Sequence, residues 1–365
     1  MSRLAEILPR RIDLRILFLA FALTAIGIAM VVSTTAGTPR ADLAGKQILF
    51  AVLGLVAAGV FLAIDYRILL QYSPGLYGFT LFVLLLLPIF GKRIAGAKSW
   101  IKMGGFQIQP SEFARISIVL LLAWILENDD RALLRTRSIA AVAAAVAVPT
   151  LLVLLQPDLG LALTYLPFLA AALFFGGIPG RWWAILIIGG TLAIGGSWFF
   201  LKDYQKDRIR TFLDPNLAAR GAGYQVRQAR IAIGSGGIFG KGWKRGTQSR
   251  LGFLPVRHTD FIFAALAEEW GFAGVSIFLA LYGFLVARAL ALARDARDRG
   301  GAMLVLLLII NIAAQALVNV AMNVGVLPTT GITLPFVSYG GSSLVATWCM
   351  VGLMLSVAYR RYVNV

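Results

Sequence analysis

Long apolar runs follow one another along almost the whole of this chain, and they leave few architectures open. Of its 365 residues 59% are hydrophobic and only 14% are charged, whereas a soluble domain carries about 25% charged residues. Runs near the roughly 20 residues of a transmembrane helix cover 14–34, 47–64, 74–90, 111–127, 138–156, 159–177, 182–201, 261–286, 302–326 and 339–359. Bare backbone is too costly in lipid, so continuous apolar runs must be helices. The sequence therefore predicts an all-α integral membrane protein with about ten transmembrane helices.

Basic residues in the short loops predict the orientation. The first run is too long for a signal peptide and lacks a clear cleavage site, so we expect it to be retained as the first helix. With the N-terminus inside, the cytoplasmic loops hold fifteen Lys and Arg residues and the short outer loops hold six. This bias places both termini in the cytoplasm. Residues 1–365 then form a single polytopic membrane domain, and 202–258 becomes a large extracytoplasmic loop between helices 7 and 8.

The net charge of +17 indicates anionic partners. Basic residues on the inner side fit anionic membrane lipid. Those of the outer loop fit an anionic substrate such as a phosphorylated lipid, or they simply keep a long loop solvated. We expect no nucleic acid on that face. The single cysteine, Cys349, and the single histidine, His258, exclude an internal disulfide and a site with several histidine ligands.

Asp260 lies where the long polar loop meets the eighth apolar run. A carboxylate is costly to hold at a membrane, so it is a functional candidate. We expect it to begin the eighth helix, where it acts either as a general base or as a cap for free N–H groups. Glu268 follows eight residues later, roughly two turns, and should share its face. Glu268 and Glu269 are expected to line the interior or a cavity, or to form structural ion pairs.

Three further charged residues open or precede other helices. Glu112 and Arg115 are three residues apart, on one helical face. They form either a local ion pair or a site in which Arg115 meets a substrate phosphate and Glu112 orients it. Asp158 either caps the sixth helix or joins Asp260 in an outer cavity. Asp158 and Asp260 could then help to hold a divalent cation, which prefers oxygen ligands and phosphate partners.

Irregular segments interrupt the helical pattern on one side of the membrane. They cover 91–110, 202–258 and 327–338, and the tight turn at 156–158 opens to the same side. The glycine-rich stretch 234–242 within the second segment matches no nucleotide-binding fingerprint. It is interpreted as a hinge or, alternatively, as backbone that contacts a pyrophosphate. The convergence of these segments predicts a site at the outer membrane surface.

Several motifs together resemble the SEDS family (shape, elongation, division and sporulation proteins). They are Pro-Thr-Thr-Gly-Ile-Thr-Leu-Pro-Phe-Val-Ser-Tyr-Gly-Gly-Ser-Ser at 328–343, Gln-Pro-Ser-Glu at 109–112, Gln-Pro-Asp-Leu-Gly at 156–160, and His-Thr-Asp-Phe-Ile-Phe at 258–263 with Glu268-Glu269. Segments 232–237, 240–243 and 246–249 resemble the elongation member more than the division member. The chain departs from the family at Ser99, where Arg is frequent, at Arg115, where Lys is usual, and at Ala219-Arg220, where Asp-Pro is usual.

The resemblance implies a peptidoglycan glycosyltransferase that polymerises lipid II in the bacterial cytoplasmic (inner) membrane during cell elongation. Asp260 would deprotonate the acceptor sugar's 4-hydroxyl, which attacks the donor's anomeric carbon with inversion, and undecaprenyl pyrophosphate would leave. Lys98, Arg115 or a divalent cation, Mg or Mn, would stabilise the leaving group, with no organic cofactor. The residues expected to bind substrate are Glu112, Arg115, Lys98, Trp100, Asp158, Arg257, His258 and Ser338. The implied partners are a class B penicillin-binding protein, which is a transpeptidase, and other elongation-complex proteins.

Two other functions remain open on the sequence. A lipid II flippase would also need many helices, a polar cavity and intramembrane carboxylates, although we find no paired broken helices of the kind typical of transporters. A non-catalytic scaffold of the elongation complex would not need Asp260, Glu112 and Asp158.

Overall fold

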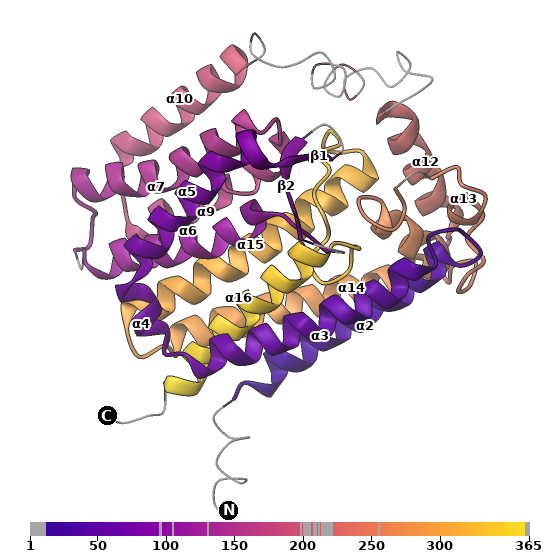
Figure 1. The fold of residues 1–365 in the computed structure, drawn as a ribbon, viewed down its shortest axis with the longest axis horizontal. Helices are drawn as coiled ribbons and strands as arrows, with labels where there is room; N and C mark the ends of the chain where they lie inside the picture. Colours follow the sequence, from indigo (N-terminus) through magenta and orange to yellow (C-terminus); the bar gives the residue numbers. More distant parts are fainter. Residues whose placement is uncertain are drawn as a thin grey trace, which may run out of the picture.

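The protein is a bundle of membrane-spanning helices, seen here in a computed structural model that describes residues 12–361 apart from 95–96, 104–105, 130, 255 and most of 198–221 (Figure 1). Its long helices are α2 (Leu14–Thr35), α3 (Asp42–Ala63), α5 (Ser73–Phe90), α6 (Pro110–Glu127), α7 (Thr136–Leu155), α9 (Leu166–Gly176), α10 (Gly180–Ser197), α12 (Ala222–Ser235), α14 (Ile262–Arg294), α15 (Arg299–Val324) and α16 (Gly341–Arg360), and short ones are α4 (Tyr66–Gln71), α8 (Leu159–Leu163) and α13 (Thr247–Arg250).

Helices occupy all ten predicted apolar runs. Within the described residues, eight candidate spans are long and apolar enough to cross a membrane, and this multi-pass architecture confirms the predicted class. The sixth run forms one candidate span, Leu159–Gly176, in which α8 and α9 are separated by a turn. The fourth and seventh runs form α6 and α10, each 18 residues long. Helix α6 is not among the eight candidate spans, and it carries the charged residues Glu112 and Arg115 in its first turns.

The most deeply buried span is α16, of whose apolar window 89% is buried. It lies beside α3 (Figure 1), and small residues bring the two backbones together. A side chain at Gly352 would lie 2.4 Å from the carbonyl oxygen of Ala58, and one at Gly54 would lie 2.8 Å from the ring of Trp348. Trp348 is itself fully buried. Glycine and alanine at such contacts allow the close helix packing that is typical of membrane interiors.

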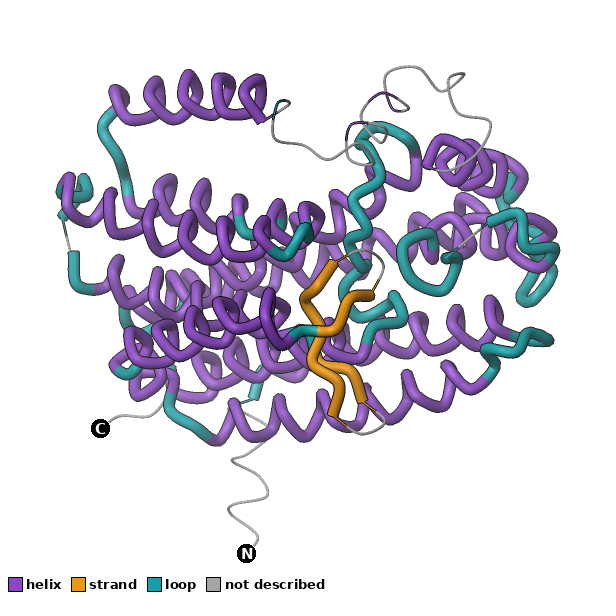
Figure 2. The backbone as a smooth tube through the Cα atoms, turned by 45° about the horizontal axis from the view of Figure 1, so that its top comes forward, coloured by secondary structure: helices purple, strands orange, loops and turns teal. Residues whose placement is uncertain are grey.

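A small antiparallel sheet joins α5 to α6. It consists of β1 (Lys92–Ile94), β2 (Ala97–Met103) and β3 (Phe106–Ile108), in that order. Lys92 pairs with Trp100, and Ile101 pairs with Ile108. The sheet crosses one face of the helical bundle (Figure 2). The prediction of an irregular segment at 91–110 is therefore refined to an ordered β-structure that reaches the start of α6.

The predicted loop 202–258 contains helices, and the expectation that it is irregular throughout was wrong. Both α12 and α13 lie within it, and α12 packs against α14 and α15. The glycine-rich stretch 236–242, which follows α12 in this segment, packs into a break in α14 at Gly271, where φ is 65°. The N–H of Phe272 donates to the carbonyl of Gly237, and the N–H of Lys241 donates to that of Glu268. At the break, backbone N–H and carbonyl groups of α14 have no partner within the helix, and the glycine-rich stretch supplies their hydrogen bonds.

Candidate functional site

A cavity of about 560 Å³ opens where the irregular segments meet. Its wall includes Trp100 of the sheet, Asp158 of the tight turn, Asp260 of the turn before α14, and residues 330–333 of the loop before α16. The predicted convergence of these segments is therefore confirmed for the described residues. Glu112 also lines the cavity, and so does Lys46 from the first turns of α3. Carboxylates and an ammonium group thus face one enclosed space.

Asp260 belongs to a turn, and not to a helix. Helix α14 begins at Ile262, with Phe261 in the cap position, so the prediction that Asp260 begins this helix was wrong. Its carboxylate lies near the loop before α16, since a side chain placed at Gly331 would lie 3.8 Å from Oδ2. The side amides of Asn319 and Asn323 both donate to the carbonyl oxygen of Asp260, at 3.1 and 3.0 Å. The backbone that carries this carboxylate is therefore fixed to α15.

Asp158 performs both of the roles that the sequence left open. One carboxylate oxygen accepts from the N–H of Leu161 at 3.1 Å, which caps α8. The other accepts from the side amide of Gln109 at 3.0 Å. Asp158 also lines the cavity, together with Asp260. Among the described residues no group of three or more His, Cys, Asp or Glu side chains could hold a metal ion.

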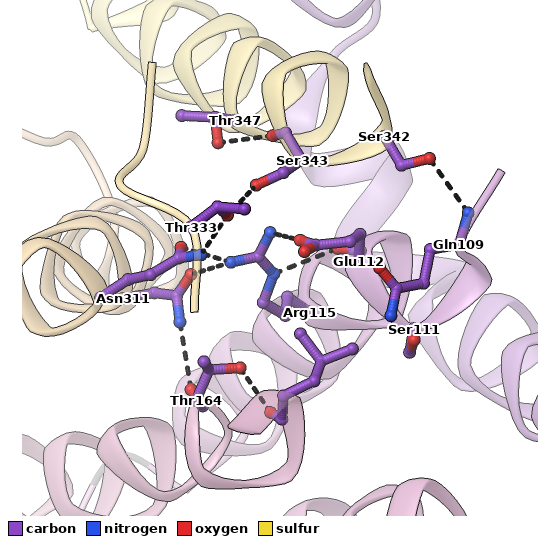
Figure 3. A network of polar contacts seen from close by, with 12 residues as sticks. Gln109, Ser111, Glu112, Arg115, Thr164, Asn311, Thr333, Ser342, Ser343 and Thr347 are labelled. Carbon is purple, nitrogen blue, oxygen red and sulfur yellow. Dashed lines mark hydrogen bonds and ion pairs between the residues drawn. The ribbon is translucent and has the colours of Figure 1, made fainter. Parts of the chain in front are cut away.

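Arg115 lies behind the cavity wall in a buried polar network (Figure 3). Its side chain is fully buried and forms an ion pair with Glu112. It also donates to the side-chain oxygen of Gln315 at 2.5 Å and lies 3.5 Å from that of Asn311. Glu112 and Gln315 line the cavity, and Arg115 stands behind them. The local ion pair is therefore confirmed, and Arg115 is not among the residues that line the cavity.

A stripe of side amides on α15 connects this network to Asp260. It consists of Asn311, Gln315, Asn319 and Asn323, spaced four residues apart. Asn311 donates to the carbonyl of Thr164, and Asn319 donates to that of Ile332 at 2.7 Å. These residues were missed in the sequence, although amides at a constant spacing of four in an apolar run are a recognisable signal, because this spacing places them on one helical face.

Four of the predicted substrate-binding residues do not line the described cavity. Lys98 donates to the carbonyl of Ile89 at 3.0 Å. Arg257 donates to the carbonyl of Thr34 at 2.8 Å. Ser338 donates to the carbonyl of Thr259 at 2.6 Å. The fourth residue is His258. Burial lowers the pKa of its imidazole from 6.5 to about 4, and the charges of Arg40 and Arg257 add to this shift. Among the predicted substrate-binding residues, the cavity is lined by Glu112, Asp158 and Trp100.

Glu268 and Glu269 are held in separate buried networks. Glu268 pairs with Lys241 at 2.8 Å and accepts from the hydroxyl of Ser249 at 2.6 Å. Glu269 accepts from the hydroxyl of Ser33 at 2.5 Å. The predicted interior position and ion pair are confirmed. The prediction that Glu268 shares a face with Asp260 was wrong, because the helix starts after Asp260.

Known proteins resemble this chain over almost its whole length. A family model for FtsW, RodA and SpoVE, described as "Cell cycle protein", matches residues 13–363. The peptidoglycan glycosyltransferase MrdB of Escherichia coli (strain K12) is 40% identical over 311 residues, which are 85% of this chain and 84% of that protein. The probable peptidoglycan glycosyltransferase FtsW of Trichlorobacter lovleyi is 36% identical over 95% of this chain and 93% of that protein.

Solved structures agree with these relatives. One, from work on the structural coordination of polymerization and crosslinking by a peptidoglycan synthase complex, has a TM-score of 0.83 at 35% identity and covers 97% of this chain and 99% of that chain. The rod shape determining protein RodA of Thermus thermophilus has a TM-score of 0.74 at 34% identity, with coverage of 97% and 98%. This chain therefore belongs to the FtsW, RodA and SpoVE family of cell cycle proteins, the SEDS family.

Proposed function

We propose that this protein is a peptidoglycan glycosyltransferase of the elongation type, which polymerises lipid II at the outer face of the bacterial inner membrane. The observation that carries the proposal is the half-buried Asp260, which lines a cavity of about 560 Å³ together with Lys46. The family membership and the relatives named peptidoglycan glycosyltransferase support the same reaction class.

The proposed reaction is a single displacement. The hydroxyl of the acceptor sugar attacks the anomeric carbon of the donor, and its proton passes to the carboxylate of Asp260. The bond between that carbon and the pyrophosphate breaks as the glycosidic bond forms, so the configuration inverts. Undecaprenyl pyrophosphate then leaves with the electron pair of the broken bond. Asp260 is suited to this role because its turn is fixed by Asn319 and Asn323.

Lys46 takes the place of Lys98 and Arg115 as the cation nearest to the leaving group. It lines the cavity, and its ammonium group pairs with Asp42 at 2.6 Å. Both side chains of this pair are more than half exposed, and such surface pairs contribute little, about 0 to 1 kcal/mol. Lys46 can therefore exchange Asp42 for a pyrophosphate oxygen at small cost.

A divalent cation remains part of the proposal. Two carboxylates, Asp158 and Asp260, line the cavity, and Mg²⁺ commonly binds one or two carboxylates together with substrate phosphates. Such an ion would supply charge stabilisation to the leaving pyrophosphate. The partners proposed for the nascent strand are a class B penicillin-binding protein and other elongation-complex proteins. This assignment is supported by the likeness to a chain from a peptidoglycan synthase complex.

The test is glycan polymerisation from purified lipid II by the protein, with and without its class B partner. We expect Asp260→Asn to abolish polymer while leaving the unfolding temperature unchanged. Asp295→Asn is the matched control, because this residue is an exposed partner of Arg361. Normal polymer from the Asp260 variant would refute the base assignment. A chelator arm tests the cation, and polymer that persists without divalent ions would remove the ion from the mechanism. No polymer from the native protein with its partner would favour flipping or scaffolding instead.

A further inference from the structure

A second cavity, which shares no lining residue with that of Asp260, lies between the first turns of α2 and the last turns of α14. Its volume is about 610 Å³, and its described lining consists of Leu14, Arg15, Phe18 and Leu19 on α2 and Phe284, Ala287, Arg288 and Ala291 on α14. We call this space the α2–α14 groove. Its members recur at spacings of three and four on both helices, so each helix presents one continuous face to it. Two alanines on α14 leave room that larger side chains would fill.

The groove changes from charged to apolar along its length. On α2, Arg15 comes three residues nearer to the helix start than Phe18, and on α14, Arg288 comes four residues nearer to the helix end than Phe284. At about 1.5 Å per residue these separations are roughly 5–6 Å. Both arginines therefore lie at the end of the groove where α2 begins and α14 ends, and both phenylalanines lie deeper. Phe18 is 67% exposed and Phe284 is 63% exposed, so their rings are accessible from the groove.

One of the two arginines in the groove is already paired with a carboxylate. The guanidinium of Arg288 is paired with Asp13, with Nε and Nη2 at 2.7 and 2.6 Å from Oδ2. Arg15 makes no hydrogen bond or ion pair to any other residue in the part of the chain that the structure describes. An exposed guanidinium beside an apolar slot, next to an arginine already fixed by a carboxylate, fits a single phosphate group.

We propose that the α2–α14 groove binds one anionic phospholipid of the leaflet at the end of the bundle where α2 begins and α14 ends. The phosphodiester would lie between Arg15 and Arg288, and one acyl chain would run past Phe18 and Phe284. Lipids of this kind recognise basic pockets between transmembrane helices. A zwitterionic lipid adds an ammonium group beside the guanidinium of Arg15, which opposes binding. This site is independent of the glycosyltransferase reaction, because none of its residues lines the cavity of Asp260.

Native mass spectrometry of the delipidated full-length protein tests the proposal. The probes are dioleoyl phosphatidylglycerol and dioleoyl phosphatidylcholine, which share acyl chains and differ in charge. We expect one retained phosphatidylglycerol and weaker binding of phosphatidylcholine. Arg15→Gln should weaken phosphatidylglycerol about fivefold, since one basic residue near a membrane surface contributes about 1 kcal/mol. Arg181→Gln is the matched control, because Arg181 is exposed at the start of α10, outside the groove.

A second variant separates the groove from general surface attraction. Ala287→Phe fills the groove without changing charge and should remove the retained phosphatidylglycerol, whereas Ala144→Phe, on an exposed position of α7 outside the groove, should not. Inorganic phosphate should fail to displace the lipid. Equal losses from Arg15→Gln and Arg181→Gln, equal binding of the two lipids, an adduct that persists in Ala287→Phe, or displacement by inorganic phosphate would each overturn the proposal.

Discussion

The buried ion pair between Glu112 and Arg115 allows a decisive test of what Arg115 does. In Arg115→Met, the carboxylate of Glu112 remains buried without its partner, and the side-chain oxygen of Gln315 loses a donor at 2.5 Å. Removing one member of a buried pair costs about 3–5 kcal/mol. At about 2–4 °C per kcal/mol for a large domain, the unfolding temperature should fall by roughly 6–20 °C.

The double variant Glu112→Gln/Arg115→Met supplies the control. It removes the uncompensated charge, so it should recover more than half of the lost unfolding temperature. Differential scanning fluorimetry in detergent measures stability, and initial rates of polymerisation at several lipid II concentrations measure kcat and KM. If Arg115 only supports the cavity wall, kcat should fall with stability and KM should change little. A variant of unchanged stability with a raised KM would refute the structural role and place Arg115 against the substrate.

Three further perturbations test other parts of the site. Asn319→Leu removes the amide donor of the Ile332 carbonyl and one of the two donors to the Asp260 carbonyl, at about 1–3 kcal/mol for an unsatisfied group. Both stability and kcat should therefore fall, whereas the exposed Asn128→Leu should change neither. Gly160→Ala places a methyl group 2.0 Å from a facing carbonyl oxygen of Thr330, so the loop must shift and polymerisation should drop at least several-fold; normal rates would show that this close approach is dispensable. Because burial holds the pKa of His258 near 4 instead of 6.5, the unfolded chain protonates this imidazole at a higher pH than the folded protein does. Stability should therefore decline as pH falls from 6.5 towards 4, and His258→Gln should flatten that slope in pH-dependent unfolding curves.

Hydropathy predicted the helical bundle because apolar runs of this length have few alternatives in a membrane. It could not predict α12, whose residues 222–235 include Arg227 and Arg230, because this helix depends on packing against α14 and α15 for its place. The start of α14 was misplaced for a related reason. Residues 256–261 form a turn in which the carbonyl group of Asp260 accepts from both Asn319 and Asn323, and those partners are distant in sequence.

The candidate site was predicted at the level of segments more reliably than at the level of side chains. Asp260, Asp158, Glu112 and Trp100 do meet at the cavity, because the irregular segments that carry them open on the same side. Lys98 was expected there, but its ammonium group folds back to the carbonyl of Ile89. Side-chain direction of this kind depends on the local strand geometry. Lys46, which does line the cavity, lies among the first residues of a helix and has no motif to mark it.

The amide stripe of α15 also has a consequence for how the nascent chain is made. Gln315 is synthesised 200 residues after Arg115. At about 5–20 residues per second, α6 waits roughly 10–40 s for this partner after its own translation. Through that interval Glu112 and Arg115 have only each other and water or lipid headgroups as partners. The fourth helix should therefore be the span most prone to leave the membrane or to be degraded by quality-control proteases. The polar network around Arg115 is therefore completed only by the ninth helix, and chains truncated before α15 should be degraded faster than their length alone explains.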